Sequence, residues 1–173
     1  MITIKKEQAD AAKEKFVELQ TYRHLMANKT GGGISPTRLY SFMRGDVDDE
    51  VAAQLKVNLG LRRAYRNLLK SQAFFHVPEA LAASTDEYPE RHCDGCVVRL
   101  QVSRAQENQL YLIIELSDQR RNIPFTLSVF GSDESCEMLD LPDARNGVIQ
   151  TIINRQSGLA RLLADPKTEI FLR

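Results

Sequence analysis

The sequence lacks tryptophan, contains only three cysteines and has no long apolar run. Three cysteines are too few, and odd in number, for the disulfide framework of a small secreted protein. The longest uncharged stretch, about residues 122 to 132, is far shorter than the roughly 20 residues that span a bilayer. The first six residues, Met1 to Lys6, lack the apolar stretch that a secretion signal needs, so none is expected. These absences predict a cytoplasmic protein with no membrane segment.

An excess of charge of one sign is also missing, because 23 basic side chains balance 23 acidic ones among the 173 residues. Residues 1–85 carry 13 basic and 9 acidic side chains, and residues 86–173 carry 10 and 14. A protein whose binding depends on contacts with phosphate groups usually has a strong excess of basic side chains, so nucleic-acid binding is disfavoured. With 43% apolar residues, the chain is a globular protein large enough for one domain or two small ones.

The N-terminal half has the apolar spacing of helices. From Thr3 to about Asn28, apolar residues recur at steps of three and four, which predicts a long amphipathic helix. Three glycines then form a flexible connector at 31–33. Ser35 and Pro36 predict the start of a second helix, with Ser35 as the N-cap and Pro36 in the first turn.

Two further helices follow with short connections. The second helix is expected to stop at Gly45, and Asp46 is expected to cap the third, whose buried stripe would include Val47. Gly60 is expected to end that helix. A fourth apolar stripe then continues to about Phe75.

Beyond residue 90 the apolar period changes from 3.6 to two, which is typical of half-buried strands. The polar stretch 85–91 before this change is the predicted domain boundary. The sequence therefore predicts an α+β protein, with a helical unit at residues 1–85 followed by an antiparallel β-sandwich or open barrel at residues 92–173. Strands are expected at 98–102, 110–116, 125–129, 136–141, 148–153 and 168–172, with an Asn146-Gly147 turn. Residues 157–165 are expected to form a short helix or a loop with a helical turn.

One motif has a chemical character, the run from His92 through Cys93 and Cys96. A Cys-x-x-Cys pair with a neighbouring His could bind zinc if Cys136 or His76 completed the tetrahedron. A redox pair is expected to precede a helix, whereas a strand follows here. The simplest interpretation is a tight Asp-Gly turn between two partly buried cysteines, with no metal and no cofactor.

No other pattern indicates catalysis. His24, His76 and His92 are the only histidines, and no nucleophile, metalloprotease or acidic metal-loop motif accompanies them. A non-enzymatic protein is therefore predicted.

A basic face on the fourth helix leaves a second function open. Arg62, Arg63, Arg66 and Lys70 follow one another at helical spacing. Three short helices with a basic last one could form a helix-turn-helix that enters the major groove of DNA, with the β-domain as a sensor or dimerisation unit. A solvated surface explains the same spacing.

The stretch from Ser35 to Leu55 resembles the opening of anti-sigma-factor domains, through its helix, its Gly45-Asp46-Val47 step and its acidic helix start. The resemblance covers about residues 35–75. The zinc-binding His and Cys pattern of that family is absent around residues 55–61, so the likeness is to its zinc-free branch. It implies a regulator that binds a protein partner, such as a sigma factor.

The leading prediction is thus a regulatory or adaptor protein whose helices bind a helical partner. Exposed apolar residues would form a groove or ridge, and arginines would form its rim. The expected partner-binding residues are Arg38, Phe42, Met43, Arg62, Tyr65, Arg66 and Leu69.

Overall fold

The computed structural model describes residues 12, 15–16, 19, 33–78, 88–118 and 122–173. The chain divides into two compact units, residues 1–71 and 72–173. The predicted helix from Thr3 to about Asn28 lies almost wholly outside the described residues, as does His24. Within the described part, no helix has the length and apolar character needed to cross a membrane.

The first unit contains three consecutive helices, α2 (Pro36–Met43), α3 (Asp49–Val57) and α4 (Leu59–Gln72). Helix α2 begins as expected, because the Ser35 side chain accepts a hydrogen bond from the Arg38 N–H at 3.2 Å. Each helix buries an apolar stripe at steps of three and four. The buried apolar residues are Leu39, Met43, Val51, Leu55, Leu61, Ala64, Tyr65, Leu68 and Leu69.

Three helix boundaries differ from the sequence prediction. Asp48, not Asp46, caps α3, because its carboxylate accepts the Val51 N–H at 3.1 Å. Val47 therefore lies outside the helix and is 91% exposed, so its predicted burial is wrong. Gly60 lies inside α4, whose first turn is held by the Asn58 side chain accepting the Leu61 N–H. The helix ends at Gln72, before Phe75.

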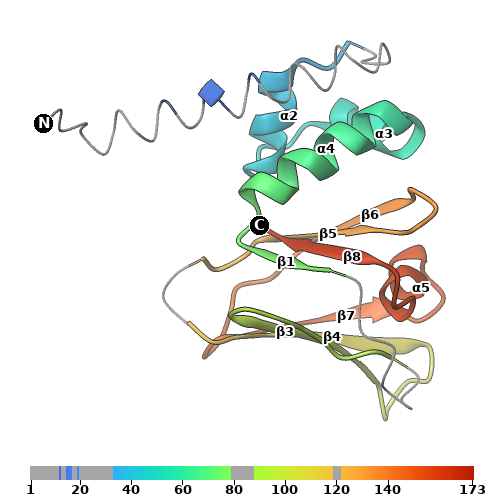
Figure 1. The fold of residues 1–173 in the computed structure, drawn as a ribbon. Helices are drawn as coiled ribbons and strands as arrows, with labels where there is room; N and C mark the ends of the chain where they lie inside the picture. The colour runs from blue at the N-terminus through green and yellow to red at the C-terminus, as the bar shows by residue number, and fades with distance from the viewer. Residues whose placement is uncertain (1–11, 13–14, 17–18, 20–32, 79–87, 119–121) are drawn as a thin grey trace, which may run out of the picture. The chain divides into compact units, whose positions relative to one another are not determined.

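The second unit consists of two four-stranded antiparallel sheets and one short helix, which makes the chain an α+β protein (Figure 1). One sheet has the order β1-β8-β5-β6, and the other has the order β2-β3-β4-β7. Both sheets are open. Their strands are β1 (Phe75–Val77), β2 (Arg91–Cys93), β3 (Cys96–Val102), β4 (Gln109–Leu116), β5 (Thr126–Phe130), β6 (Cys136–Asp140), β7 (Val148–Asn154) and β8 (Glu169–Leu172), with helix α5 (Gly158–Ala164) before the last.

Alternation along the strands produces one apolar cluster that draws on both sheets. Leu110, Leu112 and Ile114 of β4 alternate with Tyr111 and Ile113, and the first three are fully buried. They join buried residues of β5, β7 and β8 in a single hydrophobic cluster, to which α5 adds its apolar side chains. Burial on this scale is the main stabilising contribution to the unit.

The six expected strands and the short helix are confirmed within one or two residues, but two strands were missed. Strands β1 and β2 have only three residues each, too few to show a period. Strand β1 pairs with β8, so the sheet-bearing unit begins near Gln72, before the expected start at residue 92. The predicted boundary stretch ends in β2, and its residues up to 87 lie outside the described part.

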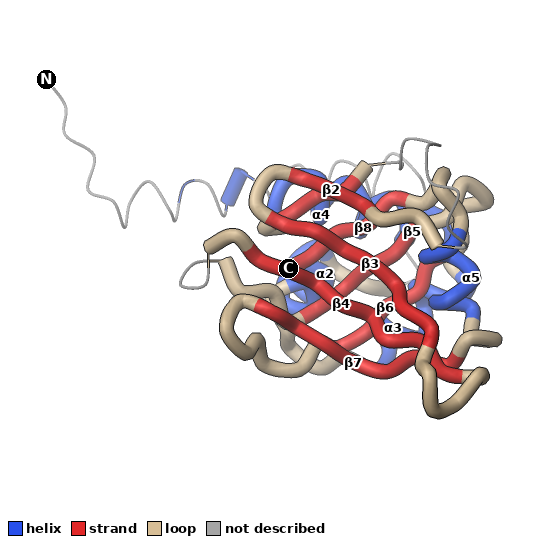
Figure 2. Tube along the Cα trace, turned by 90° about the horizontal axis from the view of Figure 1, so that it is seen from below, coloured by secondary structure: helices blue, strands red, loops and turns tan. Residues whose placement is uncertain are grey.

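Strand β7 forms an edge of its sheet, where β4 is its one neighbour among the described strands (Figure 2). The predicted tight turn leads into it, with φ of 53° at Asn146 and 78° at Gly147. These left-handed angles favour asparagine and glycine and belong to a two-residue hairpin turn. Arg145 and Val148 flank the turn and exchange both main-chain hydrogen bonds, at 2.8 and 3.0 Å.

Candidate functional site

Two of the predicted partner-binding arginines stabilise the helical unit itself. Arg38 donates from Nε and Nη2 to the Asp48 carboxylate at 2.9 and 2.8 Å, and it also pairs with Glu50 at 2.9 Å. The hydrogen bonds that Arg38 donates to Glu50 and Asp48 raise the pKa of Arg38, while the Val51 N–H and then Arg38 lower the pKa of Asp48. The guanidinium thereby joins α2 to the start of α3.

Arg62 has a comparable role at the other end of α3. Its Nη1 donates to the carbonyl oxygens of Leu55 and Lys56 at 3.1 and 2.8 Å. Those carbonyls have no partner within the helix, so the cation satisfies them and opposes the negative end of the helix dipole. A base-reading role for Arg62 would break this cap.

The apolar members of the predicted surface are mostly buried. Met43, Tyr65 and Leu69 are at most 2% exposed, so the expectation that they are exposed is wrong. Phe42 is half-buried, and its ring centroid lies 5.8 Å from that of Tyr65. Arg66 is partly exposed. The helical period located these side chains correctly on the apolar face, but period alone does not tell a core from a docking surface.

The Cys-x-x-Cys motif forms the hairpin between β2 and β3. Cys93 and Cys96 are directly opposite one another, and Asp94 and Gly95 form the turn, with φ of 89° at Gly95. Both thiols are free, and they are hydrogen-bonded to each other. His92 points elsewhere and pairs with Glu90 at 2.8 Å. The tight-turn interpretation agrees with this geometry.

The surroundings of the two thiols keep them protonated at neutral pH, which makes them poor nucleophiles. Burial is the main cause that raises the pKa of both Cys93 and Cys96. A thiol must ionise to attack a disulfide or to bind zinc. Among the described residues, no group of three or more His, Cys, Asp and Glu side chains is placed to hold a metal ion.

A pH-dependent stability follows from the Cys96 thiol, which is 2% exposed. Well below pH 8.5 the thiol is protonated in both the folded and the unfolded chain, so its ionisation costs the folded protein no stability. Above that pH the unfolded chain loses the proton while the folded chain keeps it, and stability falls. We expect Cys96 to account for a loss of about 1.4 kcal/mol between pH 7.5 and pH 9.5. Denaturant unfolding of wild type and Cys96→Ala at both pH values measures it, and an equal decline in the two proteins would contradict it.

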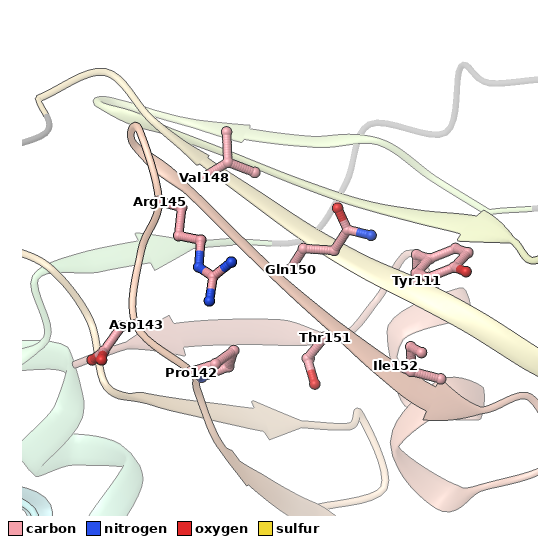
Figure 3. A pocket seen from close by; sticks show the side chains of 8 residues that line it. All are labelled: Tyr111, Pro142, Asp143, Arg145, Val148, Gln150, Thr151 and Ile152. Atoms are coloured by element: carbon pink, nitrogen blue, oxygen red, sulfur yellow. The ribbon is translucent and has the colours of Figure 1, made fainter.

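A groove of about 610 Å³ runs along the free edge of β7 (Figure 3). Strand β7 forms one wall, and the segment between β6 and β7 forms the other. No predicted site residue contributes to it. The lining residues are Tyr111, Pro142, Asp143, Arg145, Val148, Gln150, Thr151 and Ile152.

The main chain of β7 offers unused hydrogen-bonding groups to this groove. Leu116 donates its N–H to Gly147, and Arg155 donates its N–H to Asn108, so every second residue from 147 to 155 turns its main chain toward β4. Gln150 and Ile152 lie between these positions and turn their N–H and C=O groups outward. No described residue bonds to those four groups.

The neighbouring outward positions are already occupied by the chain itself. Val148 exchanges both main-chain bonds with Arg145, and the Asn154 carbonyl accepts the Ser157 N–H at 3.0 Å. The chain thus arrives through Pro142 and Asp143 and pairs with the outer edge of β7 at Arg145, in a single bridge before the turn. The open edge is the two-residue step from Gln150 to Ile152, closed at one end by the Arg145 bridge.

Side chains around the open edge supply charge and apolar surface. Figure 3 shows the Arg145 guanidinium in the space between β7 and Pro142, while the Asp143 carboxylate lies beyond Pro142. Among the described residues, none forms an ion pair or side-chain hydrogen bond with Arg145. Ile152 is 53% exposed and is in register with Tyr111 on β4.

Sequence reasoning located the turn before this groove but not the groove. One signal was available, because Ile152 puts a large apolar side chain on the face of β7 that Gln150 and Asn154 share. Within the described part of the chain, the groove has main-chain groups and a guanidinium without partners, together with an exposed apolar side chain. These features suit a ligand that forms strand-like hydrogen bonds. No protein-family model, no curated protein and no solved structure matches the chain.

Proposed function

We propose that this chain is a non-catalytic regulatory or adaptor protein of the cytoplasm that binds an extended peptide segment of a partner protein along the edge of β7. The observation that carries the proposal is the outward main chain of Gln150 and Ile152, unpaired among the described residues and lining a groove. Natural proteins usually protect such edges, and peptide-binding domains leave them open so that a partner can add a strand.

The proposed architecture is a helical recognition unit followed by a β-sandwich whose edge is the peptide site. Two open antiparallel sheets with one shared apolar cluster support the sandwich. The edge of β7 already has strand geometry. Binding of a peptide therefore costs little free energy for ordering the main chain of the site.

The anti-sigma-like function remains a second candidate, on a different surface. Val47 and Val57 are 91% and 77% exposed, and Leu59 is 39% exposed. Val47 precedes α3, Val57 ends it and Leu59 begins α4, so the three offer apolar surface to a helical partner such as a sigma factor. The DNA-binding alternative has weaker support, because Arg62 is engaged in capping α3.

Amide hydrogen exchange tests the peptide site without knowledge of the partner. In the free protein, the amides of Ile149, Thr151 and Ile153 are expected to exchange slowly, and those of Gln150 and Ile152 at least 100-fold faster, because only the first set donates to β4. Addition of a threonine- and valine-rich hexapeptide with free termini, at millimolar concentration, should slow exchange at Gln150 and Ile152. Uniform protection along β7 in the free protein, or no change with peptide, would refute the proposal.

A further inference from the structure

The groove beside β7 has a direction as well as an open edge, and its two ends differ. At one end the main chain of Arg145 occupies the position opposite Val148, so an added strand cannot continue past Gln150. At the other end, the Ile152 side chain is half-exposed. A peptide bound here must therefore end, or leave the sheet, next to Arg145.

We propose that the groove binds the C-terminus of its partner, with the terminal carboxylate beside the Arg145 guanidinium; this inference rests on the peptide-binding function proposed above. The peptide runs antiparallel to β7, in the same direction as the segment from Pro142 to Arg145. Its last residue lies opposite Gln150. Its third-last residue lies opposite Ile152.

Charge selects this orientation over the reverse one. A parallel peptide would place its ammonium terminus at the closed end, beside a guanidinium with no ion-pair partner among the described residues. An antiparallel peptide places a carboxylate there instead. The last residue and Gln150 form a hydrogen-bonded antiparallel pair. The Gln150 N–H donates to the terminal carboxylate, and the Gln150 carbonyl accepts the N–H of the last residue.

The position of the guanidinium favours a terminal carboxylate over an acidic side chain. Arg145 reaches into the space between β7 and Pro142, which is where the main chain of an added strand would end (Figure 3). Arg145 lies opposite Val148, so its side chain leaves the main chain on the face that also carries Gln150 and Ile152, and the amidated aspartate peptide below separates the two sources of a carboxylate. Charge-assisted hydrogen bonds of this kind are about twice as strong as neutral ones.

The third-last residue of the peptide determines the remaining specificity. Its side chain would lie on the face of β7 that carries Ile152, whose neighbour in register on β4 is Tyr111. The residue between the two has its main chain turned away from β7. An apolar third-last residue, a variable next residue and a free carboxylate thus define the ligand class.

The test uses the full chain and two fluorescein-labelled hexapeptides of one sequence, with leucine third from the end, one with a free C-terminus and one amidated. We expect amidation to weaken binding at least tenfold in fluorescence anisotropy. Arg145→Gln should remove this difference, whereas Arg104→Gln, an exposed arginine in the β3–β4 connection, should keep it. An amidated peptide ending in aspartate tests the side-chain source of the carboxylate.

The outcomes separate this inference from the function on which it rests. Equal binding of acid and amide, with protection of the Gln150 and Ile152 amides, would overturn the C-terminal specificity and leave the peptide site standing. Equal binding of the amidated aspartate peptide would overturn it as well. Failure of both peptides to bind or to protect those amides would overturn both proposals.

Discussion

Replacing Arg91 by alanine is expected to lower the free energy of unfolding by roughly 3–5 kcal/mol. Arg91 is 2% exposed and donates to three carbonyl oxygens, those of Thr168 at 2.9 Å, Leu163 at 3.1 Å and Asp165 at 2.5 Å. The alanine variant leaves all three acceptors without this donor, next to a cavity. The guanidinium stays charged, although burial lowers its pKa, with Asp165 acting in the opposite sense.

The reason for this large effect is where the three carbonyls lie. They belong to the end of α5 and to the turn before β8, more than 70 residues further along the chain than β2. A single side chain thus joins the edge strand of one sheet to the connection that leads into the other. The last carbonyls of a helix need partners, and a cation near the helix C-terminus is the favourable one.

Denaturant unfolding of three variants checks this prediction. Arg91→Lys should recover only part of the loss, because an ammonium cannot reach three acceptors with the geometry of a planar guanidinium. Arg104→Ala, at an exposed arginine, should change stability by less than about 0.5 kcal/mol. A loss below about 1 kcal/mol in Arg91→Ala would show that water replaces the guanidinium and that the link is not needed.

Arg91 also shows where local sequence reasoning stops. Its neighbours are polar, so composition placed it in a boundary stretch, yet it is among the most buried charged residues described. Its acceptors are main-chain atoms, which carry no residue-type signal. The strands with a clear two-residue period, such as those around Leu112 and Leu127, were predicted correctly because the period itself reflects one buried face.

The candidate site was harder to predict for a similar reason. The turn at Asn146-Gly147 follows from residue type, because both positions need left-handed backbone. Whether another strand pairs with β7 on the side away from β4 depends on the strand order of the sheet. No residue in β7 encodes that order. The predicted partner-binding surface is wrong at Tyr65 and Leu69, which are buried. A buried core and an exposed docking surface give the same spacing of apolar residues, so the sequence pattern does not distinguish them.

Proline substitutions at two adjacent positions of β7 are expected to differ in their cost to stability by roughly 2–3 kcal/mol. Thr151→Pro removes an N–H that donates to Leu112 and leaves the buried carbonyl without its partner, so it should cost roughly 3 kcal/mol. Gln150→Pro removes an outward N–H that no described residue accepts, so it should cost less than about 1 kcal/mol. Proline is tolerated in edge strands when its nitrogen faces outward.

The same pair of variants links the fold to the proposed binding. Gln150→Pro keeps the fold but removes the donor to the terminal carboxylate, so it should weaken the free-acid peptide at least tenfold, while Gln150→Ala keeps the N–H and most of the affinity. Thermal unfolding establishes that each variant is folded before peptide is added. Equal destabilisation by proline at 150 and 151 would mean that both amides are paired in the native protein. The edge of β7 would then be closed, and no strand could add to it.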